Sequence, residues 1–225
     1  MNFIFDGVSL QNGRSCNMDS LLMKSRLVAG ENALLAVVCD GVGSLAEGAF
    51  ASGTAVVKLG QWFDQLQSTN RVGLIMRDAI LDINSYIVME AGSKNYDTAS
   101  TLSVMLLVES DFYIVHIGDS RIYSYGDDGL MTLTGDDISQ TGKLTGYIGK
   151  SDDIFLQYHE GPASGKVFLL CSDGLYKMMD ESFMVSKMRN LNKRSMKETI
   201  KTLPQYVITR GERDNITFAL VLCQT

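Results

Sequence analysis

Four aspartates stand where an apolar stretch of the sequence begins or ends. Asp40 follows AVVC, Asp119 follows IVHIG, Asp173 follows LLCS, and Asp214 comes just before NITFALV. Aspartate is a poor strand residue, and a carboxylate at the end of a buried sheet loses hydration unless a cation compensates for it. A single Asp-Gly pair is more simply explained as a turn. Four such aspartates together indicate a shared site whose mutual repulsion a divalent cation would relieve.

The available donor atoms favour a hard cation at that site. Oxygen ligands select Mg²⁺ or Mn²⁺, whereas a zinc site needs nitrogen and sulfur donors that are poorly supported here. His116 and His159 are the only histidines, and we interpret each as a structural residue; His116 lies within a strand and is expected to bond to the backbone. Gly41 and Gly43 after Asp40 would let the backbone approach an ion, so that a carbonyl could be a ligand.

Two arginines could hold an anionic substrate group, because a guanidinium forks onto phosphate oxygens. These are Arg14 and Arg121. Each could equally form a surface ion pair, and spacing does not decide between the two. The segment DGVG is neither a dinucleotide fingerprint nor a P-loop, so nucleotide binding is unsupported.

The composition is that of one globular domain with its own core. The chain has 225 residues, 45% of them apolar and 20% charged, and a formal net charge of -6. Such a charge supplies no basic field for nucleic acid or an anionic membrane. The apolar runs are far shorter than the roughly 20 residues of a membrane span. We see no secretory signal and expect a cytoplasmic protein with reduced cysteines. Three of the four cysteines end apolar runs and are expected to be small core residues.

Apolar and alternating runs predict at least eight strands, and helical periodicity fills the gaps. Because the strands cluster and lack crossover helices, we expect an α+β fold with mostly antiparallel pairing. Pro204 is expected to mark a kink or a fresh helix start, and Gly211 a helix cap. The expected strands are 2–10, 21–28, 33–39, 101–108, 112–117, 121–125, 167–171 and 216–223, and the expected helices lie at 46–66, 72–87, 182–192 and 195–210.

With these motifs in their order, the sequence resembles the metal-dependent protein phosphatase family, the type 2C serine/threonine phosphatases, and in particular its short bacterial members. The resemblance covers nearly the whole chain and implies a sandwich of two antiparallel β-sheets flanked by helices on both outer faces. It also implies a binuclear Mn²⁺ or Mg²⁺ centre. The matching segments are GRSCNMDS at 13–20, VVCDGVGSLAEGAFAS at 37–52, STLSVMLLVE at 100–109, VHIGDSRIYSY at 115–125, LLCSDGL at 169–175 and RDNITFALV at 213–221.

The resemblance assigns metal ligands by position. It makes Asp40 the carboxylate that bridges both ions, with the Gly41 carbonyl on one ion and Asp173 and Asp214 on the other. Asp119 corresponds to a position that, together with Asp173, binds a weaker third metal in bacterial members. These assignments are implied by the family pattern and are expectations here.

The resemblance also assigns residues that handle the substrate and the water. Asp19 would orient metal-bound water, Arg14 would hold the substrate phosphate, and Asn215 would support Asp214. The implied reaction is attack by a metal-bridging hydroxide on a phosphoserine or phosphothreonine ester, without a covalent enzyme intermediate. Val42 stands where many eukaryotic members have histidine, so a metal-bound water is the expected proton donor. The expected partner is a phosphorylated protein, such as a substrate of a bacterial serine/threonine kinase.

Four departures from the family pattern motivate an alternative. Met18, Ala49 and Ala99 replace residues that are usually polar or glycine in the family. The segment 136–165, which corresponds to the flap beside the family's active site, is short. We expect the whole chain, 1–225, to form a single domain. The alternative is a catalytically weak module that binds a regulatory phosphoprotein. A calcium-binding structural domain is less supported, because no D-x-D-x-D-G loop occurs.

Overall fold

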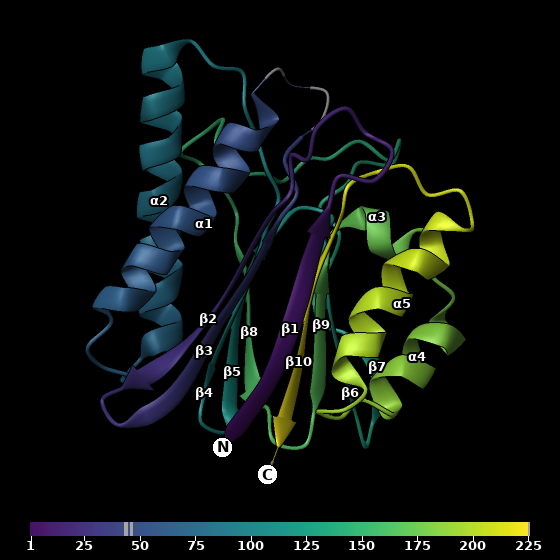
Figure 1. Ribbon diagram of the computed structural model, residues 1–225. Coiled ribbons are helices and arrows are strands. Elements are labelled where there is room, and N and C mark those ends of the chain that lie inside the picture. The colour runs from purple at the N-terminus through teal and green to yellow at the C-terminus, as the bar shows by residue number, and fades with distance from the viewer. Residues whose placement is uncertain (43–44, 46, 225) are drawn as a thin grey trace.

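The computed structural model describes residues 1–42, 45 and 47–224, and their strands form two five-stranded sheets (Figure 1). One sheet has the order β1-β10-β9-β6-β7 and the other β2-β3-β4-β5-β8, and every pair of neighbours is antiparallel. This confirms the α+β sandwich. The strands are β1 (Asn2–Leu10), β2 (Ser20–Val28), β3 (Glu31–Cys39), β4 (Leu102–Val108), β5 (Asp111–Ile117), β6 (Arg121–Gly126), β7 (Gly129–Thr132), β8 (Gln157–Pro162), β9 (Val167–Cys171) and β10 (Ile216–Gln224).

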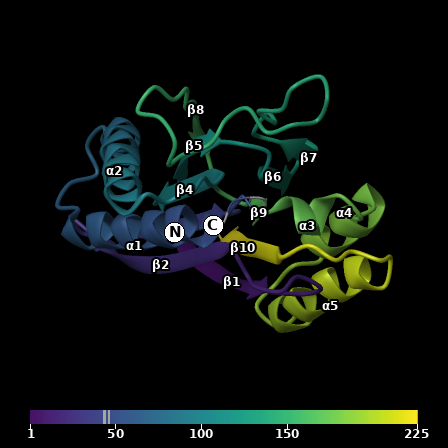
Figure 2. The ribbon, with the colours of Figure 1, turned by 90° about the horizontal axis from the view of Figure 1, so that it is seen from above.

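Helices cover both outer faces of the sandwich. Figure 2 shows α1 and α2 at one side of the strands and α3, α4 and α5 at the other. The first pair packs on the sheet that contains β3, and the other three pack on the sheet that contains β10. The helices are α1 (Gly48–Gln65), α2 (Val72–Lys94), α3 (Asp173–Tyr176), α4 (Glu181–Arg189) and α5 (Met196–Ile208).

The continuous apolar runs arise because the central strands are buried on both faces. Along β3, Leu34, Ala36 and Val38 face the space between the two sheets. Their alternate neighbours face the helices α1 and α2. Successive side chains of a strand point to opposite faces of the sheet, so each central strand contributes side chains to two core layers. The strands β3, β9 and β10 that lead to the strand-end aspartates are therefore inner strands of their sheets.

The eight predicted strands are confirmed with small shifts at their ends, but three elements were missed: β7, β8 and the short helix α3. The helix expected from Ala46 begins at Gly48, and both Ala46 and Gly43 lie outside the described residues. The helix α5 continues through Pro204 to Ile208, so the prediction of a fresh start there is wrong. Gly211 does adopt a positive φ of 98° beyond that helix.

All four cysteines are unpaired, and three of them are buried, as the sequence predicted. Cys16 is the exposed one. Among the helices that the structure describes, none is both long and apolar enough to cross a membrane.

The segment between β7 and β8 is hydrogen-bonded, near its start, to the turn between β5 and β6. Described residues 133–156 contain no helix or strand, only isolated bridges such as that between Ile138 and Leu144. Asp137 fastens this segment to the β5–β6 turn: its N–H donates to the Gly118 carbonyl (2.8 Å), and its Oδ2 accepts from the Gly118 N–H (2.8 Å). The segment therefore starts from a fixed point beside Asp119.

Candidate active site

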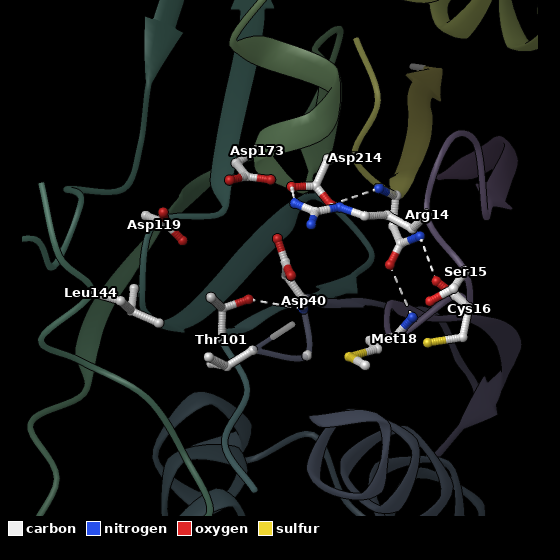
Figure 3. Close-up of a pocket in the computed structure, with 13 residues that line it drawn as sticks. Arg14, Ser15, Cys16, Met18, Asp40, Thr101, Asp119, Leu144, Asp173 and Asp214 are labelled. Atoms are coloured by element: carbon white, nitrogen blue, oxygen red, sulfur yellow. Dashed lines mark hydrogen bonds and ion pairs between the residues drawn. The ribbon is translucent and has the colours of Figure 1, made fainter. Parts of the chain in front are cut away.

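One pocket of about 230 Å³ brings together the aspartates that the sequence singled out (Figure 3). Asp40, Asp119, Asp173 and Asp214 all line it. Arg14 reaches into it from the loop between β1 and β2. The other lining residues are Ser15, Cys16, Met18, Gly41, Val42, Thr101, Leu144 and Asn215.

The aspartates meet because of the direction of their strands. Asp40 follows β3 and Asp173 follows β9, whereas Asp214 precedes β10. Since β10 runs antiparallel to β9, the start of one lies beside the end of the other. The two sheets pack face to face, so residues from both reach the same end of the sandwich. The strand pairing therefore collects carboxylates from distant parts of the sequence.

Hydrogen bonds to its backbone hold Asp40 in place. Its N–H donates to the Thr101 hydroxyl (2.9 Å), and its carbonyl accepts from the Thr101 N–H (2.9 Å) and the Ser100 hydroxyl (3.0 Å). The next residue must be glycine, because a Cβ on Gly41 would lie 2.5 Å from the Met18 carbonyl oxygen. The Asp40 carboxylate is thus presented to the pocket by a backbone with little freedom.

Arg14 forms a two-pronged ion pair with Asp214. Its Nε and Nη2 donate to the two carboxylate oxygens at 2.7 and 2.6 Å. The loop that carries Arg14 is tied down by the Asn215 side chain, which donates to the Gln11 and Cys16 carbonyls and accepts from the Met18 N–H. The Asn215 N–H also donates to Asp214 Oδ1 (2.8 Å). Asn215 therefore links Asp214 to the arginine loop.

The electrostatics of the pocket are dominated by uncompensated negative charge. Burial, followed by the charges of the surrounding aspartates, raises the pKa of Asp40 well above its ordinary value. Burial and the charge of Asp173 likewise raise the pKa of Asp119. Burial alone would also raise the pKa of Asp214, but the hydrogen bonds from Arg14 and the Asn215 N–H and the charge of Arg14 outweigh it, so that pKa lies below its ordinary value. A cation in the pocket would stabilise the ionised form of each group.

Asp19 is buried at the start of β2 and is not among the residues that line the pocket. Its Oδ2 accepts a hydrogen bond from the Ser172 hydroxyl (2.9 Å), next to Asp173. Burial raises the pKa of Asp19 to about 6, although its hydrogen bonds oppose the shift. The role of Asp19 in orienting water therefore stays a prediction. Its contact with the pocket is indirect, through Ser172.

The raised pKa of Asp19 predicts a pH-dependent stability of the metal-free protein. Between its unfolded pKa of about 3.9 and its folded pKa, the folded state binds more protons, so the unfolding free energy falls as pH rises. Asp19→Asn, which keeps an acceptor for Ser172, should become more stable relative to the wild type by about 2 kcal/mol between pH 4 and pH 7. Urea unfolding of both proteins with chelator measures this difference; a difference that stays constant with pH contradicts it.

The donor set fits hard divalent cations, although the carboxylates do not stand ready-made around one ion. Among the described residues, no three Asp, Glu, His or Cys side chains are grouped closely enough to hold a metal as they lie. Two carboxylates are engaged by cationic side chains instead: Asp214 by Arg14 and Asp173 by Lys177. The oxygen donors of these carboxylates suit Mg²⁺ or Mn²⁺. A metal ion bound at Asp214 or Asp173 would therefore compete with Arg14 or Lys177.

Neither histidine lines the pocket, and neither does Arg121. His116 is fully buried, and its two ring nitrogens bond to the Ser103 hydroxyl and the Gly118 carbonyl, which confirms its structural interpretation. His159 is exposed on the edge strand β8. Arg121 forms a two-pronged ion pair with Asp136 at 2.9 and 2.7 Å, so the ion-pair alternative holds for it.

Sequence reasoning missed the neutral and cationic partners of the aspartates. The Thr101 hydroxyl also bonds to Ser120, and the Tyr176 hydroxyl donates to the Asp119 carbonyl (2.8 Å). Lys177 pairs with Asp173 from the next turn of α3. A signal existed for some of them, since Ser120 and Ser172 stand directly beside a strand-end aspartate.

Comparison with known proteins gives consistent matches. The model of the family described as Protein phosphatase 2C matches residues 7–206. The serine/threonine phosphatase stp of Listeria welshimeri is 30% identical over 217 residues, which is 85% of each chain. The protein phosphatase PhpP of Streptococcus pneumoniae is 29% identical over 82% of this chain and 84% of its own. The crystal structure of the serine/threonine phosphatase Stp1 from Staphylococcus aureus superposes with a TM-score of 0.90 at 20% identity, covering 100% of this chain and 96% of that one, and supports the fold.

Proposed function

Since the chain belongs to the protein phosphatase 2C family of serine/threonine phosphatases, we propose that it hydrolyses phosphoserine and phosphothreonine esters in proteins with two Mn²⁺ or Mg²⁺ ions. The observation that carries the proposal is the meeting of Asp40, Asp119, Asp173 and Asp214 in one pocket beside Arg14. We propose the whole chain, 1–225, as a single domain with a shortened flap at 136–165.

In this proposal Asp40 would contribute to both ions, the Gly41 carbonyl to one, and Asp173 and Asp214 to the other. Asp119 would add a donor for a weaker third ion. Two cations held there would lower the pKa of a bound water and polarise the phosphoryl oxygens. Support comes from the pKa of Asp40, which burial and the neighbouring carboxylates raise well above its ordinary value in the absence of such charge.

Arg14 is proposed to bind the substrate phosphate. Its guanidinium already lies at the pocket with both donors used by Asp214. Once Asp214 serves a metal, the same two donors become free for two phosphate oxygens, which match the spacing of a carboxylate. Asn215 keeps this loop in reach through its bonds to Cys16 and Met18. Asp19 is proposed to orient the attacking water through its position behind the pocket.

The leaving alkoxide must be protonated by water in this proposal. Val42 occupies the position after the D-G pair, and His116 is buried with both ring nitrogens engaged. Neither can deliver a proton to a substrate oxygen. We therefore propose that a water bound by the metal ions would be the donor.

The proposed substrate is a phosphoprotein, such as one that a bacterial serine/threonine kinase modifies, in the cytoplasm. The names of the relatives support the phosphoprotein class. Purified protein should release phosphate from a phosphothreonine peptide in the presence of Mn²⁺ with kcat of about 1 s⁻¹ or more. Tight capture of the peptide without turnover would contradict this proposal and support the alternative of a binding module.

Arg14→Ala should chiefly raise KM. If the guanidinium binds the phosphate equally in the ground and transition states, KM rises about 10- to 100-fold while kcat changes little. Steady-state kinetics on the phosphothreonine peptide measures both constants. The matched control is Arg210→Ala, which removes another exposed arginine–aspartate pair, that with Asp180, remote from the pocket. If kcat falls by a similar factor, Arg14 acts in the transition state. If KM is unchanged, Arg14 does not bind the substrate phosphate.

A further inference from the structure

Lys177, the residue that follows α3, forms an ion pair with an aspartate of the carboxylate pocket. Asp173 is the first residue of this helix, and Lys177 follows one turn later with its N–H bonded to the Asp173 carbonyl (3.1 Å). Its ammonium forms an ion pair and hydrogen bond with Asp173 Oδ2. The backbone bond fixes the start of the lysine side chain, so the charge stays near the pocket.

This pair differs from an ordinary pair on a helix surface. The Asp173 side chain is only 14% exposed and lines the pocket, whereas the Lys177 side chain is 54% exposed. A surface pair between two exposed groups would contribute little. Here the lysine compensates a carboxylate that is mostly removed from water and surrounded by others of the same charge.

The charge of Lys177 acts on more than its direct partner. Asp119 lies beside Asp173 on the side of the pocket away from the arginine loop (Figure 3). The Lys177 ammonium lies against Asp173, so its positive charge also acts on the neighbouring Asp119. One ammonium group therefore compensates the Asp119–Asp173 side as Arg14 compensates Asp214.

Lys177 remains charged in this position. A lysine has an ordinary pKa of about 10.4, and the ion pair with Asp173 favours its charged form. The ammonium is therefore a poor proton donor at neutral pH. Its chemistry is that of a fixed positive charge.

We infer that Lys177 is a tethered counter-ion that competes with a divalent cation at the Asp119–Asp173 side of the pocket. This inference rests on the proposed function, which places metal ions at these carboxylates. A permanent positive charge there repels an incoming cation and occupies one Asp173 oxygen. The chain then needs only the two ions around Asp40 and holds a third weakly.

Calorimetric titration of Mn²⁺ into the metal-free full chain tests this without any measurement of activity. Lys177→Met removes the charge and keeps the length of the side chain, and Lys177→Arg keeps the charge. The matched control is Lys94→Met, because Lys94 forms another i,i+4 pair with a glutamate, Glu90, on α2. We expect Lys177→Met to bind its weakest Mn²⁺ equivalent about tenfold more tightly than the wild type. Lys177→Arg and Lys94→Met should titrate like the wild type.

The outcomes separate this inference from the proposed function. Equal or weaker Mn²⁺ binding by Lys177→Met, with normal binding by the wild type, overturns the counter-ion role and leaves the phosphatase proposal intact. If Lys94→Met binds Mn²⁺ more tightly by the same factor, the counter-ion role is also overturned. The change in affinity would then come from the net charge of the protein. If the wild type binds no Mn²⁺, both proposals fail. Thermal unfolding in chelator verifies that every variant is folded.

Discussion

Replacing Asp40 with asparagine should lower kcat/KM on a phosphothreonine peptide by about 10³-fold or more, because it removes the one carboxylate proposed to touch both metal ions. Asparagine keeps the shape of the side chain. It also leaves the three backbone hydrogen bonds to Ser100 and Thr101 in place. The loss should therefore come from charge and not from a displaced strand end.

The same variant should be no less stable than the wild type in chelator at neutral pH. Burial and the surrounding carboxylates raise the pKa of Asp40, so its ionised form is disfavoured in the metal-free fold. Asp64→Asn is the control, since Asp64 is a half-exposed carboxylate paired with Lys24 outside the pocket. Full activity in Asp40→Asn, or loss of activity together with loss of folding, would contradict the assigned role.

Removal of divalent cations should abolish turnover, and Mn²⁺ should restore it. Among the described residues, Arg14 and Lys177 are the direct cationic partners of the pocket aspartates. Neither supplies the divalent charge that would lower the pKa of a bound water. Activity should fall about 10³-fold in chelator. Saturating Mn²⁺ at 100 times its dissociation constant should also stabilise the fold by about 2.7 kcal/mol, because only the folded chain assembles the site.

Phosphate release and thermal unfolding in chelator, with and without added Mn²⁺, measure both effects. Asp40→Asn is the control for the stabilisation, and it should show a smaller shift in its unfolding midpoint. Activity that survives chelation would contradict metal-dependent hydrolysis. Stabilisation of the wild type and of Asp40→Asn by the same amount would place the metal elsewhere.

Most of the fold could be predicted because the central strands are buried on both faces. Runs such as those of β3 and β10 are continuous and apolar, and their ends coincide with turns. The missed strand β8 has the sequence QYHEGP and is an exposed edge strand, so it carries no apolar run. The helix α3 has only four residues, too few for a periodic pattern.

The candidate site could also be predicted only in part from the sequence. Aspartates at strand ends are visible in the sequence, and antiparallel pairing of the strands is enough to bring Asp173 and Asp214 together. Their partners depend on geometry that no spacing reveals. Arg14 meets Asp214 across 200 positions, and Asp19 meets Ser172 across 153. Lys177 had a local signal, four residues after Asp173, but a helix of that length was not predicted.

Anomalous diffraction from crystals soaked in Mn²⁺ tests most directly whether these aspartates hold two hard cations. We expect two strong manganese peaks in the pocket, about 3.5–4 Å apart, with Asp40 between them and Asp173 and Asp214 on one. We also expect that Arg14 has left Asp214. A pocket without manganese, in crystals of a protein that Mn²⁺ activates, would contradict the proposed metal site.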